Sequence, residues 1–157
     1  MGIKTSCLCS GRLKHATFEG TPTYTLHGLR TPCKILRVYD GDTVWLAARV
    51  HAKVYKYKVR MYGYDSPEMK PLLSKPDRNV EMALAKDARK YLEDLLTGKK
   101  VEAEFFEYCK YGRPLVNLYT LTRGLPPVCV NQAMIDARHG KVYFGKKKPT
   151  WGSPEQL

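Results

Sequence analysis

The chain has 157 residues, of which 43% are apolar and 27% charged, and this is the size and composition of one globular domain. No apolar stretch approaches the length that spans a bilayer, and five cysteines without paired spacing argue against a disulfide framework. The net charge of +12 favours polyanionic partners, either nucleic acid or an anionic membrane surface, although lysines that only confer solubility are the alternative.

The beginning of the chain lacks the apolar run of a secretory signal. Because the odd cysteine count also favours a reducing compartment, we expect an intracellular, cytoplasmic protein that is not secreted by a signal peptide. Residues 1–31 show no sustained periodicity, and we interpret them as an irregular basic N-terminal extension.

Five short segments combine apolar, β-branched and aromatic residues in the pattern of strands. Asp40-Gly41 separates the first two segments as a two-residue hairpin turn, and the third segment alternates apolar or aromatic residues with basic ones. The predicted strands are Cys33–Tyr39, Thr43–Ala48, Val54–Tyr64, Val101–Phe106 and Leu115–Leu121.

Two segments show helical character. After Pro76 the apolar residues recur on one helical stripe, with Asp77 as the N-cap and Gly98 as the stop signal. Val128–Arg138 is typical of a second, shorter helix, and the prolines and glycine within 149–157 predict a flexible tail. The predicted helical stripe consists of Val80, Leu84, Ala88, Tyr91, Leu92, Leu95 and Leu96.

Five strands with a helix between the third and the fourth predict a small closed sheet, because closure leaves no open strand edge. An OB-fold barrel is the usual five-stranded solution. We therefore predict an α+β fold in which residues 32–148 form a five-stranded OB-fold β-barrel with two or three helices.

Charged residues gather in turns at the ends of the predicted strands. The turn after the first strand delivers Asp42 to the start of the second, whereas Asp40 is expected to serve the turn itself. In the segment from Asp65 to Glu68, Pro67 cannot continue the strand and holds Ser66 extended, so that the Ser66 carbonyl group can turn outward.

The residue types in these turns suit phosphodiester chemistry. Two aspartates and a backbone carbonyl form an all-oxygen ligand set, which a hard cation such as Ca²⁺ prefers. A third carboxylate can activate water, and the forked guanidinium groups of Arg60 and Arg113 can hold the charged phosphorus centre. Each motif alone is more often a structural turn, so the prediction depends on their combination.

In order and spacing the combination resembles the staphylococcal nuclease (thermonuclease) family, whose domain has an OB-fold. The resemblance covers residues 33 to about 145. Its motifs are Val38–Val44, Val59-Arg60 followed by Asp65–Glu68, Lys110–Arg113 and Val130–Ala133.

This resemblance implies a calcium-dependent nuclease that hydrolyses phosphodiester bonds of DNA or RNA with little sequence specificity and leaves 3′-phosphate ends. By the same resemblance the catalytic residues are Arg60, Glu68 and Arg113, the Ca²⁺ ligands are Asp42, Asp65 and the Ser66 carbonyl oxygen, and the substrate-binding residues are Lys110, Tyr111 and Tyr143.

The alternative is a catalytically inactive nucleic-acid-binding module, as in the degenerate repeats of Tudor staphylococcal nuclease proteins. Such repeats typically lack some of the carboxylates or arginines, whereas this chain retains all of them, which favours the enzyme. One departure is that the tail, broken by proline and glycine, cannot supply the long C-terminal helix of the staphylococcal enzyme. We expect a monomer.

The first six residues, 1–6, fit the N-myristoylation pattern. Gly2 would carry the acyl chain, and Cys7 and Cys9 are candidates for palmitoylation, which together would anchor the protein to a membrane. A chance match is the alternative explanation. A zinc site that includes Cys33 matches no standard ligand spacing and is disfavoured.

Overall fold

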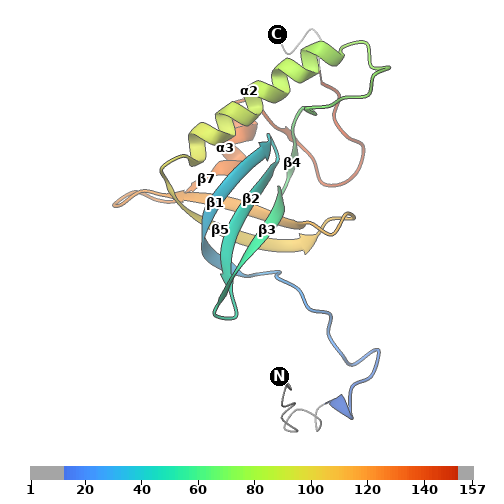
Figure 1. Ribbon diagram of the computed structural model, residues 1–157, viewed down its shortest axis with the longest axis vertical. Coiled ribbons are helices and arrows are strands. Elements are labelled where there is room, and N and C mark those ends of the chain that lie inside the picture. Colours follow the sequence, from blue (N-terminus) through green and yellow to red (C-terminus); the bar gives the residue numbers. More distant parts are fainter. Residues whose placement is uncertain (1–12, 152–157) are drawn as a thin grey trace, which may run out of the picture.

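The structure, a computed structural model, describes residues 13–151. Gly2, Cys7 and Cys9 therefore lie outside the described residues, and the lipidation hypothesis stays a prediction. Five strands form a closed mixed β-barrel with two helices, an OB-fold-like α+β architecture that confirms the predicted class at this level (Figure 1). Neither of these two helices is long and apolar enough to cross a membrane.

The barrel strands follow the predicted segments, and all except the third extend slightly beyond them. Neighbouring strands pair in the order β3-β2-β1-β5-β6, and a short parallel pairing between β3 and β6 closes the barrel through Arg60 and Leu115. All other barrel pairs are antiparallel. The five strands are β1 (Arg30–Asp40), β2 (Thr43–Val50), β3 (Lys53–Met61), β5 (Lys100–Tyr108) and β6 (Pro114–Leu121).

The third predicted strand is too long. β3 ends at Met61, and Gly63 adopts a φ of 83°, a left-handed conformation that glycine reaches without steric cost. The chain then begins the short strand β4 (Tyr64–Asp65), which pairs with β8 (Lys141–Val142) outside the barrel. This break moves Asp65 off the barrel sheet, next to the C-terminal segment.

The second predicted helix is also shorter than expected. Its first two residues instead form β7 (Val128–Cys129), which pairs with the end of β6, and α3 covers only Val130–Asp136. The side chain of Asn131 explains the fixed position of α3, because it bonds the backbone of β6 at Leu118 and Val116 at 3.0 Å each and the Tyr62 carbonyl at 2.9 Å.

The long helix α2 (Arg78–Leu96) ends as predicted, with Gly98 at a φ of 71° directly after its C-cap. Asp77 occupies the N-cap position but forms no side-chain capping hydrogen bond. The buried face also differs from the predicted stripe, because Val80 and Leu84 are only partly buried. The residues that α2 buries are Glu81, Ala85, Ala88, Leu92 and Leu96.

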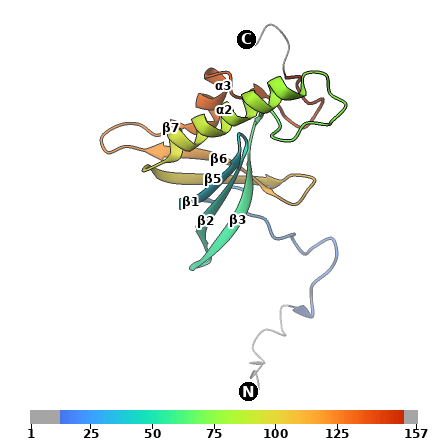
Figure 2. The same ribbon diagram turned by 45° about the horizontal axis from the view of Figure 1, so that its top comes forward.

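Both helices lie at the same end of the barrel, and the hairpin between β2 and β3 points away from them (Figures 1 and 2). The core extends past the predicted domain limits at residues 32 and 148. Leu26 is 3% exposed and belongs to the core cluster, β1 starts at Arg30, and Trp151 is 5% exposed. Isolated apolar residues such as Leu26 and Trp151 carry no periodic signal, so the sequence placed them outside the domain.

Candidate active site

Barrel closure brings the predicted site residues together. The parallel pair of β3 and β6 places Arg60 opposite Leu115, so the turn that carries Arg113 lies beside the end of β3. On the other side of β3, Arg60 pairs with Thr43, the first residue of β2 and the neighbour of Asp42. Residues 42, 60 and 113, far apart in the sequence, therefore meet at one end of three adjoining strands.

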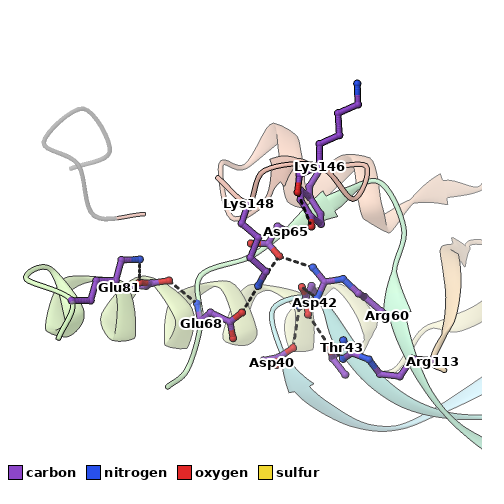
Figure 3. Close-up of polar contacts among 12 residues, drawn as sticks. Asp40, Asp42, Thr43, Arg60, Asp65, Glu68, Glu81, Arg113, Lys146 and Lys148 are labelled. Atoms are coloured by element: carbon purple, nitrogen blue, oxygen red, sulfur yellow. Dashed lines mark hydrogen bonds and ion pairs between the residues drawn. The ribbon is translucent and has the colours of Figure 1, made fainter. Parts of the chain in front are cut away.

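Asp42 and Asp65 share one guanidinium group (Figure 3). Nη1 of Arg60 lies 2.6 Å from Oδ2 of Asp42, and its Nη2 lies 2.5 Å from Oδ1 of Asp65. All three side chains are largely excluded from water, with exposures of 14% for Arg60, 8% for Asp42 and 2% for Asp65. The two aspartates of the predicted calcium site are thus buried neighbours that share a cation of the protein itself.

The turn that carries Asp42 has little room for variation. The Asp42 N–H donates to Oδ1 of Asp40 at 3.3 Å, which is the turn role predicted for Asp40. A Cβ atom on Gly41 would lie 2.9 Å from the Ser66 side chain, closer than real Cβ contacts, so only glycine fits there. The buried Tyr64 hydroxyl donates to the Gly41 carbonyl oxygen at 2.8 Å and holds the turn against β4.

Glu68 lies at the mouth of the site and is held by two contacts that the sequence did not predict. Its backbone N–H donates to Oε1 of Glu81 at 3.2 Å, and Glu81, only 2% exposed, forms an ion pair with Lys75. Its side chain, 52% exposed, pairs with Lys148, whose Nζ lies 2.5 Å from Oε1 of Glu68 and 3.5 Å from Asp65 (Figure 3).

Arg113 reaches the same cluster through a hydroxyl group. Its Nη1 donates to Oγ1 of Thr43 at 3.1 Å, and that hydroxyl donates to Oδ1 of Asp42 at 2.7 Å. Within residues 13–151 Arg113 forms no ion pair with a carboxylate, in contrast to Arg60. Most of the donors of this guanidinium therefore remain available to an anionic ligand.

The predicted substrate residues line the same pocket, which has a volume of about 850 Å³. Tyr111 is 71% exposed, and Nζ of Lys110 lies 5.0 Å from its ring centre. The Tyr143 N–H donates to the Gly63 carbonyl oxygen at 2.9 Å, which fixes this residue beside the break after β3. Every catalytic and substrate residue that the sequence predicted lines this pocket, together with Asp42 and Ser66, and Asp65 contacts it through Arg60 and Lys148.

Burial controls the electrostatics of the carboxylates. It raises the pKa of Asp42 to about 7, although the neighbouring Arg60 guanidinium acts in the opposite direction. Burial also raises the pKa of Asp65, against the lowering effects of Lys148 and Arg60. Burial alone would lower the pKa of Arg60, but the two aspartates raise it, so this guanidinium stays charged.

The predicted ligand set consists of oxygen donors, the type of donor that a hard cation prefers. Asp42 and Asp65 are close enough to share one guanidinium, and Ser66, only 3% exposed, directly follows Asp65. The described part of the chain holds no group of three or more His, Cys, Asp and Glu side chains arranged for a metal ion. The proposed set needs only two carboxylates and a carbonyl oxygen, and water would complete the coordination of Ca²⁺.

Neither the models of known protein families nor the curated proteins contain a match to this chain. The assignment to the staphylococcal nuclease family therefore stays a prediction that depends on the motifs and on the geometry of the site.

Proposed function

We propose that this protein is a calcium-dependent nuclease of the staphylococcal nuclease type, which hydrolyses phosphodiester bonds of DNA or RNA with little sequence specificity and leaves 3′-phosphate ends. The observation that supports it most is that one open pocket is lined by Asp42, Arg60, Glu68 and Arg113, with Asp65 bound to it through Arg60. Buried acidic groups beside guanidinium groups support the proposal, because the former could hold a cation and the latter an anion.

Each residue has a role that its position allows. Arg113, without a carboxylate partner among the described residues, would bind a non-bridging oxygen of the phosphate, assisted by Arg60. Glu68, half-exposed at the pocket mouth, would accept a proton from the attacking water. Calcium held by Asp42, Asp65 and the Ser66 carbonyl oxygen would supply positive charge beside the phosphate.

In the proposed reaction a water oxygen forms the new bond to phosphorus and the bond from phosphorus to the 5′ oxygen breaks. One proton of the water passes to Glu68 and returns to solvent, and the leaving 5′ oxygen takes up a proton. The guanidinium groups bind the transition state more strongly than the substrate, because negative charge builds up on the oxygens around phosphorus. Lys148 must leave Glu68 before this carboxylate can act as a base.

The same contacts favour one alternative, a nucleic-acid-binding module without catalysis. Arg60 binds both aspartates and Lys148 binds Glu68, so the protein neutralises its own acidic cluster. If Ca²⁺ cannot displace these cations, the basic surface would still bind polyanions.

Degradation of plasmid DNA and of RNA, each with Ca²⁺ or with EGTA, distinguishes the two functions. We expect calcium-dependent cleavage that falls about 10²–10⁴-fold in Glu68→Gln and about 10²–10³-fold in Arg113→Ala. Asp94→Asn and Arg89→Ala remove the same charges from the exposed side of α2 and should keep full activity. Binding without cleavage under Ca²⁺, Mg²⁺ and Mn²⁺ would contradict the enzyme.

A further inference from the structure

The second half of β1 has an open edge. β1 pairs with β2 from Cys33 to Asp40, but it pairs with β5 only from Arg30 to Cys33. Among the described residues, no strand pairs with this other side of β1 from Lys34 onward. Because the N–H and C=O groups of a strand point alternately to its two sides, this edge presents backbone donors and acceptors that β2 does not use.

The open edge lies in a groove of about 600 Å³, beside the last turn of α2 (Figure 1). Its apolar lining includes Leu96, 4% exposed, and Val38, 6% exposed. The register between β1 and β2 shifts after Ile35, which leaves Leu36 as an extra residue with an exposed fraction of 46%. The β1–α2 groove, as we call it, is lined by residues 33–38, Glu93 and residues 96–100.

The rim of the β1–α2 groove is basic. Lys34 and Arg37 are exposed on β1, and Lys99 and Lys100 are exposed after the end of α2. Within residues 13–151 none of these four side chains forms an ion pair. Glu93, the acidic residue of the lining, already pairs with an arginine of α2 that lies 3.0 Å away. The groove therefore has an excess of uncompensated positive charge, which attracts an acidic partner.

The two faces of the sheet differ in chemistry at this edge. Lys34 and Arg37 are exposed on the outer face, whereas Ile35 and Val38 pack with the core. Because the side chains of a strand point alternately to the two faces, a strand added at this edge would place every second side chain beside cations and the others beside apolar groups. The edge therefore fits a strand in which acidic and apolar residues alternate.

The charge of the edge also disfavours a second copy of this chain as the occupant. Charged side chains and bulges at an open edge commonly prevent two sheets from joining, since like charges would meet. The same cations attract an acidic strand. Residues 34–38 offer five positions, which match a strand about 17 Å long, an ordinary length for a strand.

We propose that the β1–α2 groove binds an extended acidic segment of another protein, which adds to β1 as a further strand. Main-chain hydrogen bonds to the edge between Lys34 and Val38 supply the affinity, and the alternation of acidic and apolar side chains supplies the specificity. No described residue lines both this groove and the active-site pocket. The inference is therefore independent of the proposed nuclease function, and the bound segment should leave cleavage unchanged.

Fluorescence anisotropy with labelled, capped seven-residue peptides tests the binding. The first peptide alternates glutamate and valine, and the second has the same composition with its glutamates together. Two further versions of the first carry backbone N-methyl groups at odd or at even positions, so that one of them cannot donate hydrogen bonds to β1. We expect the first peptide to bind at least about fivefold more tightly than the second and than one N-methylated version. Equal binding of all four, or tighter binding of oligo(dT) in EGTA, would overturn the proposal, because charge alone would then explain the affinity.

Two matched pairs of substitutions locate the binding site. Lys34→Gln with Arg37→Gln removes two cations from the edge and should weaken binding of the alternating peptide about 2- to 30-fold, the range for two cross-strand charge pairs. Lys53→Gln with Lys147→Gln removes the same charge from positions outside the groove and should bind like the wild type. All four side chains are exposed, so both variants should fold. An equal effect of the two pairs, or no effect of the first, would contradict binding in the groove.

Amide hydrogen exchange distinguishes strand addition from adsorption of the peptide to the cations. The bound peptide should slow the exchange of the amides within residues 34–38 that β2 does not bond, and it should leave the hairpin tip at His51 and Ala52 unchanged. Binding without protection of residues 34–38 would refute the added strand. Peptide binding in a protein that cleaves no nucleic acid would refute the nuclease alone, and cleavage in a protein that binds none of the peptides would refute this inference alone.

Discussion

Replacing Arg60 with methionine tests whether Asp42 and Asp65 form a cation site that the Arg60 guanidinium occupies in the absence of calcium. Methionine keeps the length of the aliphatic stem and removes the guanidinium group, so Asp42 and Asp65 lose their shared partner. The carboxylates then stay buried near one another, and the cation that remains beside them is Lys148, half-exposed and 3.5 Å from Asp65. Without calcium, the folded state should be strongly destabilised at a pH at which both carboxylates are ionised.

The magnitude follows from the burial of the three side chains. Their exposures are 14%, 8% and 2%, so water screens the pair poorly and the value for a broken buried ion pair applies, about 3–5 kcal/mol of unfolding free energy. For a chain of this length that loss lowers Tm by roughly 6–20 °C. The matched variant Arg89→Met breaks a surface pair with Glu93, 3.0 Å apart and about a third exposed, and should cost about 0.5 kcal/mol or less.

Urea unfolding at pH 8, with EGTA or with Ca²⁺, measures the effect. Calcium at a hundredfold excess over its Kd should stabilise the wild type by about 2.7 kcal/mol. In Arg60→Met the gain from calcium should be larger, because the ion replaces the missing positive charge and no guanidinium competes with it. Lowering the pH to 5 should also recover stability, since protonation removes the unpaired charges. Destabilisation no greater than in Arg89→Met, or no response to calcium, would refute this view of the site.

The structure supports four further predictions. Because burial raises the pKa of Asp42 to about 7, a proton competes with the cation for this carboxylate. The Ca²⁺ affinity measured by calorimetry should therefore be about tenfold weaker at pH 6 than at pH 8. Equal affinities would contradict a role for Asp42 as a ligand. The raised pKa also means that the calcium-free protein loses stability as the pH rises from about 4 to 7, since the folded state holds the proton that the unfolded state has released. Lys148→Gln should tighten calcium binding between about 1.4- and fivefold, the range for a half-exposed ion pair, whereas Lys146→Gln, whose side chain points away from the carboxylates in Figure 3, should not. Finally, iodoacetamide should modify Cys109 long before Cys33. Burial, together with the charge of Glu102, raises the pKa of Cys33 to about 12. Burial also acts to raise the pKa of Cys109, but hydrogen bonds from the backbone of Tyr111 and Arg113 and the Arg113 guanidinium outweigh this effect and lower it. Peptide mass spectrometry measures the order in which the two thiols are modified.

Local sequence patterns predicted the parts of the fold that local physics determines. The alternation of apolar and basic residues before Met61 identified β3, because one face of that strand is buried and the other is not. Asp40-Gly41 identified the hairpin turn, and Gly98 the end of α2. In each case the residue that determines the local structure lies within a few positions of it, so a short window of sequence is sufficient to predict that structure.

Long-range features escaped the same reasoning. Glu81 looks like a solvent-exposed helical residue, yet it is buried because Lys75 and the backbone of Glu68 supply its partners. The burial of Ala85 beside it rotates the buried face of α2 relative to the predicted stripe. Small residues on that face lie against the Asp40–Asp42 turn, since a Cβ on Gly41 would lie only 3.0 Å from Ala88. The periodicity of apolar residues does not show where two backbone segments approach closely, or where a charged side chain is buried with its partner.

The contacts of Lys148 had no sequence signal, because they depend on how the C-terminal segment returns to the site. β8 pairs with β4 at Asp65, and Lys141 donates to the Thr150 carbonyl oxygen at 2.7 Å while its Nζ lies 4.8 Å from the Trp151 ring centre. These contacts hold the segment between residues 141 and 151 in a loop that places Lys148 over Glu68.

Arg60 and Lys148 together imply a conflict between stability and calcium binding. Both cations neutralise the carboxylates that the proposed reaction requires, so they stabilise the protein in the absence of calcium and oppose the ion when it arrives. Substitutions that weaken these ion pairs should therefore raise calcium affinity and lower the stability of the calcium-free protein together. A module that only binds nucleic acid has no such linkage, because its cations never need to leave the carboxylates. The sign of this correlation across a series of variants thus separates the two proposed functions even before cleavage is measured.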